Sequence, residues 1–387
     1  MKVLYLTDSL SDLDGVGRYA IRLISALEER KSGLEVEILL ARKHRPNSAQ
    51  IPKHWKVSVA LPPDYFFYMA PSRFWPSLAL GVARAWAPAR RADLVHAIKD
   101  YPHNLLALLA AKAAGRPCVA TAHGTYSVQP LLDPRHAKLS RWTYRRLASV
   151  ISVSRYTARR LDEELRAGEL AGDRLHVIPN SVDAAHYLGA RSVGTQPWHG
   201  KRYTLAMGEL KERKGHHVSI EAFARVAQRH PELHHFLIGK HSDADYKREL
   251  DALIARYGMT ERVHLVGNVT EDEKIDMLQR AAAFVHTPVT SKDGGFEGFG
   301  IVYLEAAACG VPCIGTRESG AEDAVADGEN GLLAEPNVDA VERALERLIS
   351  EPELAARMGS AGRAHAERSS WRDNAERVLA IYEKALR

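Results

Sequence analysis

Residues 294–305 read Gly294-Gly-Phe-Glu-Gly-Phe-Gly-Ile-Val-Tyr-Leu-Glu305, and the chain continues through Ala-Ala-Ala-Cys-Gly-Val-Pro312. A glycine-rich turn leads here into an apolar, alanine-rich helix, with seven residues between the carboxylates of Glu297 and Glu305. We expect Glu297 to lie in the turn, where backbone N–H groups are exposed, and Glu305 to lie on about the second helical turn. A carboxylate among leucine and alanine neighbours needs hydrogen-bond donors, and a ribose diol would supply two.

The chain has 387 residues, which is too long for one ordinary hydrophobic core and predicts two domains. Hydrophobic residues make up 45% and charged residues 26%, as in soluble globular proteins. No segment approaches the roughly eighteen unbroken apolar residues of a membrane-spanning helix. The N-terminal run from Met1 turns acidic at Asp8, so we expect a buried first strand and not a signal peptide.

Short apolar segments alternate with amphipathic segments along the chain. We expect strands at 3–7, 36–40, 93–97, 117–122, 149–154, 175–179, 203–207, 235–238, 263–266, 283–285 and 312–315. We expect helices at 16–30, 103–114, 138–147, 156–166, 218–229 and 247–257, and from about 338, 352 and 371. Strands that alternate with helices predict a doubly wound parallel-sheet α/β fold, Rossmann-like in each domain.

Residues 188–200 lose all periodicity and are predicted to be a linker. The alternation of strand and helix restarts after them. We therefore place one α/β domain at 1–190 and a second at 200–370.

The net charge of +5 is unevenly distributed. Residues 1–190 hold 27 basic and 17 acidic residues, a net charge of +10, whereas the remainder holds 26 and 31, a net charge of −5. A basic half indicates an anionic partner such as phosphate, acidic lipid or nucleic acid, with simple drift of surface charge as the alternative. No nucleic-acid recognition motif accompanies the charges, so we expect no nucleic-acid partner.

The chain has three cysteines, Cys118, Cys309 and Cys313. They make no disulfide framework and indicate a reducing, cytoplasmic compartment. Cys309 and Cys313 are four residues apart, but no further Cys or His pair completes a zinc set. We therefore expect core thiols and no metal site.

The segment Gly15-Val-Gly17-Arg-Tyr-Ala20 satisfies the G-x-G-x-x-G/A dinucleotide pattern. In that pattern the first glycine follows the strand almost at once, whereas about seven residues separate Thr7 from Gly15 here. The strand expected at 36–40 is also followed by basic residues, and not by the carboxylate that the dinucleotide pattern requires. A glycine loop before a helix can still hold a phosphate with its N–H groups, and glycines used only for turning are the alternative.

Two further segments are suited to an anionic ligand. Gly208-Glu-Leu-Lys-Glu-Arg213-Lys214-Gly215 directly follows the first strand of the second domain, at the sheet edge where ligands bind in open α/β folds. Lys214 can act as a compact charge on a diphosphate, and a solvated charged loop is the alternative. The turn before the alanine-rich helix offers consecutive backbone N–H donors, at Gly298, Phe299, Gly300 and Ile301.

Together these features resemble a retaining glycosyltransferase of the large family four, with the GT-B fold, over nearly the whole chain. The strongest part of the resemblance is the paired-glutamate segment 296–312. Supporting segments are 14–17, 122–124, 177–183, 214–215 and 330–333. The last helix, 371–387, is similar to the family's closing helix, which crosses back onto the N-terminal domain, so we assign it to the first domain.

The resemblance implies roles at the matching positions. The second domain would bind a nucleotide sugar and the first would bind the acceptor. Glu305 would hold the ribose, Lys214 the diphosphate, and Glu297 with the backbone of 298–301 the transferred sugar. His123 would lie near the reacting face of the sugar, and Gly15 and Gly17 would close over the phosphate. The implied catalytic residues are His123 and Glu297, and the implied donor-binding residues are Gly15, Gly17, Arg213, Lys214, Gly298, Phe299, Gly300, Ile301 and Glu305. No cofactor and no metal are expected, because lysine and helix N–H groups would neutralise the phosphate.

One position departs from the family pattern. The family usually has arginine directly after the glycine at 208, as a second diphosphate clamp, and this chain has Glu209. A carboxylate cannot clamp phosphate. Compensation by Arg213, Lys211 or Arg18 and a weaker or differently tuned donor site are the alternatives.

The acceptor side is less distinct. Residues 64–75 are dense in aromatic residues and precede Arg84, Arg90 and Arg91, and a second basic run at 135–146 contains Trp142. Aromatic residues beside arginines suit an anionic membrane surface or a lipid-diphosphate acceptor, and they equally suit a helix packed in a core.

The sequence therefore predicts a two-domain hexosyltransferase that uses GDP-mannose or a UDP-sugar and acts with retention on a glycan or lipid-linked acceptor. Synthesis of a cell-surface polysaccharide or glycolipid is the expected setting, in the cytoplasm or peripherally on the inner face of the membrane. A catalytically idle nucleotide-sugar- or glycan-binding protein and an NAD(P) oxidoreductase are the alternatives.

Overall fold

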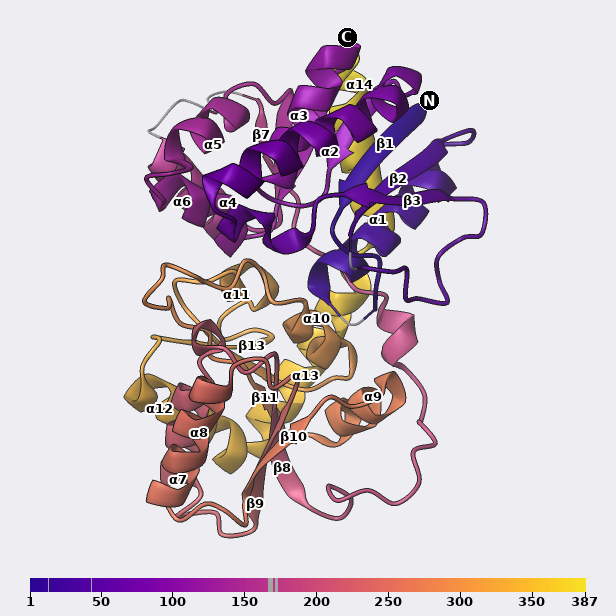
Figure 1. Cartoon of the computed structure of the whole chain (residues 1–387). Helices are drawn as coiled ribbons and strands as arrows, with labels where there is room; N and C mark the ends of the chain where they lie inside the picture. The colour runs from indigo at the N-terminus through magenta and orange to yellow at the C-terminus, as the bar shows by residue number, and fades with distance from the viewer. Residues whose placement is uncertain (13, 43, 166–169, 171–172) are drawn as a thin grey trace. The chain divides into compact units, whose positions relative to one another are not determined.

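The computed structural model describes residues 1–12, 14–42, 44–165, 170 and 173–387. Within them the chain forms two compact units, each built on a parallel β-sheet with helices between successive strands (Figure 1). Unit 1 comprises Met1–Asn180 with Trp371–Arg387, and unit 2 comprises Ser181–Ser370. The predicted doubly wound α/β architecture is confirmed.

The sheet of unit 1 has the strand order β3-β2-β1-β4-β5-β6-β7. Its strands are β1 (Lys2–Thr7), β2 (Glu35–Ala41), β3 (Lys56–Leu61), β4 (Leu94–Ala97), β5 (Cys118–Ala122), β6 (Ser149–Ser152) and β7 (Leu175–Val177). Leu4, Tyr5 and Leu6 are fully buried, as expected for a central parallel strand covered on both faces. The order reverses at β1, which pairs with both β2 and β4 and thereby brings the loops after β1 and β4 to one sheet edge.

The helices of unit 1 cover both faces of this sheet (Figure 1). They are α1 (Gly15–Arg30), α2 (Pro71–Arg91), α3 (His103–Ala114), α4 (Thr125–Leu132), α5 (Ala137–Tyr144), α6 (Arg155–Leu165) and α14 (Trp371–Ala385), with the 3-10 turn η1 (Asp64–Tyr68). The C-terminal helix α14 packs along α1, and the Tyr382 hydroxyl lies 2.6 Å from His96 Nδ1 on β4. The last helix is thus an integral part of unit 1.

Unit 2 repeats the arrangement with the strand order β10-β9-β8-β11-β12-β13. Its strands are β8 (Arg202–Met207), β9 (Leu233–Ile238), β10 (Val263–Gly267), β11 (Ala283–Val285), β12 (Cys313–Thr316) and β13 (Gly331–Ala334). Its helices are α7 (His216–Val226), α8 (Ala244–Arg256), α9 (Glu271–Arg280), α10 (Ile301–Ala308), α11 (Ala321–Ala324), α12 (Val338–Ser350) and α13 (Pro352–Arg368). The 3-10 turns η2 (Ala184–Tyr187) and η3 (Glu212–Lys214) complete the unit. Its core gathers side chains from the central strands and from α7, α8 and α12.

The unit boundary lies earlier in the chain than the sequence analysis placed it. Residues 181–190 were assigned to the first domain, whereas the structure includes them in unit 2. The reason is the turn η2, which packs against α10 and α13. The segment around 188–200 therefore lies within unit 2.

Several elements were missed by the sequence analysis. Strand β3 is an edge strand in which only Leu61 is buried, and α2 contains Pro76 and Pro88, which obscure its helical pattern. Helix α9 is rich in acidic residues, and β13 begins at Gly331 and is only four residues long.

All three cysteines are free and buried. Burial raises the pKa of the Cys309 thiol to about 12 and raises the pKa of the Cys313 thiol further. This confirms the prediction of core thiols.

Backbone packing fixes the loop that follows β8. Gly215 adopts φ +66°, and a Cβ atom there would lie 1.7 Å from the Thr287 carbonyl oxygen. The two segments can approach this closely only because residue 215 has no side chain. The approach holds the end of η3 against the segment that follows β11.

We expect Gly215→Ala to lower the free energy of unfolding by about 2–5 kcal/mol, because left-handed strain and the steric overlap with Thr287 add together. Gly258→Ala is the matched control, since Gly258 has φ +65° and a Cβ there would meet no heavy atom within 4 Å. Gly258→Ala should lower the free energy of unfolding only by the left-handed backbone strain, which is about 1–2 kcal/mol. Urea denaturation measures both values, and equal losses in the two variants would contradict the packing argument.

Candidate functional site

Lys214 and His286 follow two neighbouring strands of unit 2. Lys214 ends the turn η3, which comes shortly after β8, and His286 directly follows β11. Strands β8 and β11 are adjacent and parallel, so their carboxyl ends meet at one sheet edge. This edge is where open α/β sheets bind ligands.

Glu297 lies among three nitrogen groups at this edge. Its carboxylate forms an ion pair with the Lys214 ammonium, and Oε2 lies 3.5 Å from both Arg213 Nη1 and His286 Nε2. Only 8% of Glu297 is exposed, and His286 is fully buried. The structure thus brings together the predicted residues Arg213, Lys214 and Glu297.

The environment keeps this carboxylate ionised. Burial alone would raise the pKa of Glu297, but Lys214, His286 and Arg213 outweigh it and hold the pKa well below the ordinary 4.5. Burial lowers the pKa of His286, so its ring is neutral at neutral pH. Burial also lowers the pKa of Lys214 from 10.5, while the contact with Glu297 opposes the loss of its proton.

The glycine-rich turn leads from Glu297 into α10. Gly300 is the residue before the helix and has φ +79°, which favours glycine. A Cβ at Gly320 would lie 2.2 Å from the Gly298 carbonyl oxygen, and the Gly320 N–H donates to the Glu297 carbonyl oxygen at 2.9 Å. Phe299 is buried, so this residue can offer a ligand only its backbone. The first-turn N–H groups of a helix have no intrahelical acceptor and carry its positive end.

Glu305 lies on the second turn of α10 and is only 1% exposed, as the sequence predicted for a buried carboxylate. Its Oε1 accepts hydrogen bonds from the Tyr187 hydroxyl at 2.7 Å and from Lys274 Nζ at 3.2 Å. The protein itself therefore supplies hydrogen-bond donors to Glu305, whereas we had expected a ribose to supply them.

The unusual Glu209 is paired within its own loop. Its Oε2 lies 2.7 Å from Lys211 Nζ. Burial would raise the pKa of Glu209, but the hydrogen bond and the charge of Lys211 lower it. Lys211 thus neutralises Glu209, whereas Arg213 is directed toward Glu297, and Arg18 belongs to unit 1.

In unit 1, the loop after β1 is held by Asp14. Its Oδ1 accepts from the Gly17 N–H at 2.7 Å and caps α1, and its Oδ2 accepts from the Ser9 hydroxyl at 2.5 Å. A Cβ at Gly17 would come within 2.6 Å of the Ser11 backbone, so packing explains this glycine. A Cβ at Gly15 would meet no heavy atom of the described part of the chain within 4 Å, so packing among these residues does not explain Gly15.

His123 follows β5 at the carboxyl edge of the unit 1 sheet. Its Nε2 lies 2.8 Å from the Ile98 carbonyl oxygen, which can only accept, so Nε2 carries the proton. Burial lowers the pKa of His123 despite the nearby Asp100 carboxylate. The ring is therefore neutral at neutral pH, with Nδ1 as its acceptor atom. Asp100 also accepts from the His123 backbone N–H at 3.1 Å.

Sequence reasoning missed four residues that shape these sites. His286 and Asp100 each lie just beyond a strand end, and a systematic survey of such positions would have found them. Tyr187 on η2 and Lys274 on α9 contact Glu305. No local sequence pattern indicates a partner that lies so far away in the sequence. Among the described residues, no group of three or more His, Cys, Asp or Glu side chains could hold a metal ion.

Solved structures share this fold. One is HepE from Anabaena with UDP and glucose, at a TM-score of 0.73 and 21% identity, covering 98% of this chain and 99% of that one. Another is sucrose-phosphate synthase from Thermosynechococcus elongatus, at a TM-score of 0.76 and 19% identity, covering 99% and 98%. The two parallel-sheet units of the protein show the GT-B fold.

Family models match both units: "Glycosyltransferase Family 4" at residues 13–186 and "Glycosyl transferases group 1" at residues 194–365. A GDP-mannose-dependent α-(1-6)-phosphatidylinositol monomannoside mannosyltransferase from Mycolicibacterium smegmatis is 30% identical over 295 residues, which are 72% of this chain and 73% of the relative. A phosphatidyl-myo-inositol mannosyltransferase from Mycobacterium tuberculosis is 27% identical over 337 residues, covering 84% and 82%. The chain belongs to the family-four glycosyltransferases.

None of the helices in the described part of the chain combines the length and the apolar character needed to cross a membrane.

We expect the stabilising effect of the Glu297 charge to disappear in acid. Because its folded-state pKa lies below 4.5, the unfolded chain binds the proton more readily, and stability falls as the pH drops through the folded-state pKa. The difference in unfolding free energy between wild type and Glu297→Gln should therefore be largest above pH 4.5 and shrink below it. Its slope should not exceed about 1.4 kcal/mol per pH unit.

Urea denaturation between about pH 3 and pH 7 measures this difference. Glu353→Gln, at an exposed position of unit 2, is the control and should show little change. A constant difference between wild type and Glu297→Gln at every pH would contradict the prediction.

Proposed function

We propose that the protein transfers a hexose from a nucleoside-diphosphate sugar, with retention of configuration, to a glycan or lipid-linked acceptor. The observation that carries the proposal is the buried Glu297 carboxylate in contact with Lys214 beside the N-terminus of α10. A sugar diphosphate presents hydroxyls next to phosphates, and this site presents a hydroxyl acceptor next to a cation.

Lys214 would bind the diphosphate. Cleavage of the bond to the sugar places growing negative charge on the leaving phosphate and leaves an oxocarbenium-like sugar. A preorganised ammonium and the positive end of α10 stabilise that charge as it develops. Arg213 would add a second cation and thereby take over the role that arginine at position 209 usually plays.

Glu297 would accept hydrogen bonds from two hydroxyls of the transferred sugar, with the backbone of 298–301 aligning the same ring. Its depressed pKa favours this role, because an ionised carboxylate accepts and does not donate. The nearby cations make it a poor nucleophile. We therefore propose same-face attack, in which the leaving phosphate takes the proton of the acceptor and no protein nucleophile participates.

Glu305 would bind the ribose of the donor. Tyr187 and Lys274 fix the orientation of this carboxylate through Oε1. A ribose hydroxyl would have to share the carboxylate with these two donors. Both donors also reduce the cost of burying the charge.

Unit 1 would contribute His123 and the glycine loop. The neutral His123 ring has its proton fixed on Nε2 by the Ile98 carbonyl, so Nδ1 can accept a hydrogen bond from a sugar hydroxyl. Gly15 would let the backbone approach the phosphate, since no heavy atom of the described residues lies within 4 Å of the place that a Cβ would take there.

The relatives support two donor classes. The mannosyltransferase from Mycolicibacterium smegmatis is named as GDP-mannose-dependent, and HepE was solved with UDP-glucose. The higher sequence identity of the mannosyltransferase favours GDP-mannose, with UDP-sugars as the second candidate. Synthesis of a cell-surface glycolipid or polysaccharide is the setting that we propose.

We expect Lys214→Ala to lower kcat/KM for transfer by a factor of roughly 100 or more, equivalent to about 2.7 kcal/mol of transition-state stabilisation. Lys247→Ala is the matched control, since Lys247 lies on α8 and pairs with Asp251 at 2.7 Å. It should leave the rate unchanged. Near-normal transfer by a folded Lys214→Ala protein would refute the assignment of Lys214.

We expect a thermal-shift panel to identify the nucleotide. GDP or UDP should raise the unfolding midpoint, whereas NADP should not, and ADP serves as the comparison purine diphosphate. The shift and the turnover should persist in EDTA, because amine and N–H groups neutralise the phosphate. Slow hydrolysis of the matching nucleotide sugar would exclude a catalytically idle binder, and stabilisation by NADP alone would contradict the proposal.

A further inference from the structure

Helix α2 has two apolar stripes, one that faces the core and one that is exposed. The core-facing stripe is Phe74, Leu78, Gly81, Ala85 and Ala89, all of them buried. A second stripe lies one position further along, at Trp75, Ala79, Val82 and Trp86. The side chains of Trp75 and Trp86 are 55% and 41% exposed. A surface helix normally presents a single apolar stripe to its core and polar residues elsewhere.

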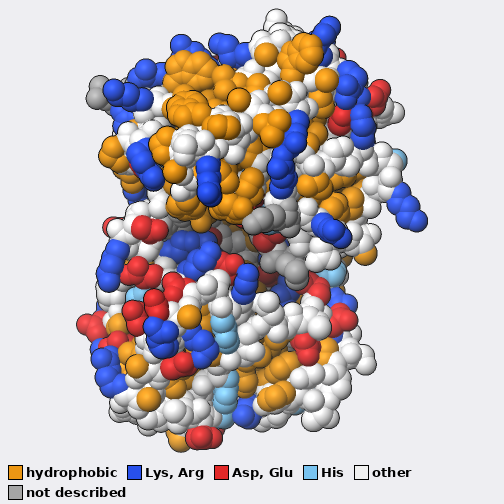
Figure 2. Space-filling view, viewed as in Figure 1, with side chains coloured by type: hydrophobic (Ala, Val, Ile, Leu, Met, Phe, Trp, Pro, Cys, Tyr) orange, Lys and Arg blue, Asp and Glu red, His pale blue; other side chains and the backbone are white. Residues whose placement is uncertain are grey.

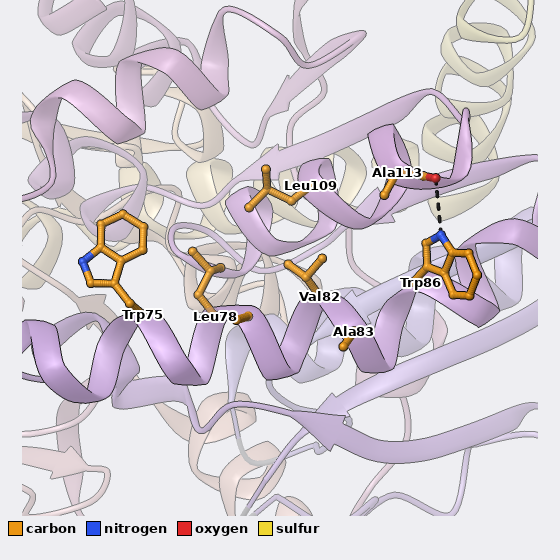
Figure 3. A pocket seen from close by; sticks show the side chains of 8 residues that line it. Trp75, Leu78, Val82, Ala83, Trp86, Leu109 and Ala113 are labelled. Atoms are coloured by element: carbon orange, nitrogen blue, oxygen red, sulfur yellow. Dashed lines mark hydrogen bonds between the residues drawn. The ribbon is translucent and has the colours of Figure 1, made fainter.

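The second stripe forms one wall of a groove between α2 and α3. The groove has a volume of about 760 Å³, and all its lining residues are apolar: Trp75, Leu78, Ala79, Val82, Ala83 and Trp86 on α2, with Leu109 and Ala113 on α3. Figure 3 shows Trp75 and Trp86 at opposite ends of this stripe, with Leu109 above Leu78 and Val82. The indole N–H of Trp86 donates to the Ala113 carbonyl oxygen at 3.3 Å.

Basic residues gather at the Trp86 end of the apolar groove. The segments of α2 and α3 contain five basic residues and no acidic residue, and of these Arg90 and Lys112 lie at this end. Arg84 and Arg91 lie on the β3 side of α2, where Arg84 donates to the Ala60 carbonyl oxygen and Arg91 pairs with Glu37. The Arg90 guanidinium lies 5.0 Å from the centre of the Trp86 ring, and Lys112 extends toward Trp142, which Arg146 also covers. Over α2 and α3, Figure 2 shows a broad hydrophobic area with blue Lys and Arg side chains scattered across it and around it.

We propose that this face of unit 1 docks on an anionic lipid bilayer, with α2 lying parallel to the membrane plane. Tryptophan prefers the boundary between headgroups and acyl chains, and the two tryptophans are eleven positions apart, about 16 Å along the helix. Arg90, Lys112 and Arg146 beside the groove would contact anionic headgroups while the groove meets the acyl region. Their positive charge favours an anionic bilayer over a neutral one. A second copy of the chain would bring the same positive charge against itself.

This inference does not depend on the chemistry of transfer. The groove contains none of the residues that we assign to the donor or to catalysis. Docking is therefore measured without donor and fails or succeeds independently of the proposed function.

The test is co-sedimentation of the full chain with vesicles of phosphatidylcholine alone and of phosphatidylcholine with phosphatidylglycerol. We expect binding to the anionic vesicles at low salt and release at high salt, where the attraction is screened. Trp75→Glu should weaken this binding roughly ten-fold or more, because it places a carboxylate in the apolar stripe. Val266→Glu, at a 38% exposed position on β10, is the matched control and should bind like the wild type.

A second pair of variants isolates the charge. Arg90→Ser with Lys112→Ser should weaken binding to anionic vesicles, whereas Arg248→Ser with Arg256→Ser makes the same change of charge on α8 and should not. Circular dichroism and the thermal midpoint verify that each variant is folded. Failure of the wild type to bind anionic vesicles, equal binding to neutral vesicles, or a dimer that Trp75→Glu converts to monomer would each overturn the proposal.

Discussion

The ionised, buried Glu297 carboxylate is the constraint around which unit 2 is organised. A buried charge is stable only where cations and donors surround it, so Lys214, Arg213 and His286 must converge on one point. These groups come from the ends of adjacent parallel strands. Adjacent pairing of β8 and β11 is what allows that convergence, and the fold and the charge arrangement therefore depend on each other.

Close backbone approaches make this arrangement rigid. Gly215 lies against the segment after β11, and Gly320 lies against Gly298. Each glycine removes a side chain at a contact where a Cβ atom would overlap a carbonyl oxygen. The Lys214 loop and the Glu297 turn are thereby fixed by main-chain contacts. A site that must stabilise developing charge benefits from such rigidity, because its groups need not reorganise as the reaction proceeds.

Much of the fold and of the site could be predicted from the sequence. Continuous apolar runs predicted the central strands, and the glycine-rich turn predicted the placement of Glu297 before α10 and of Glu305 on its second turn. Edge strand β3 and the proline-containing α2 were missed because their patterns are mixed. The partners Tyr187 and Lys274 were missed because each is far from Glu305 in sequence, and only packing brings them together.

The sequence by itself determined the two α/β units, the buried glutamates and the family, because these follow from local periodicity and from contiguous motifs. The tertiary structure alone decided the nitrogen partners of Glu297, the pairing of Glu209 with Lys211 and the inclusion of residues 181–190 in unit 2. It also decided which side of α2 is covered. Sequence spacing shows which residues share a helical face, but only packing shows which of two apolar stripes remains exposed.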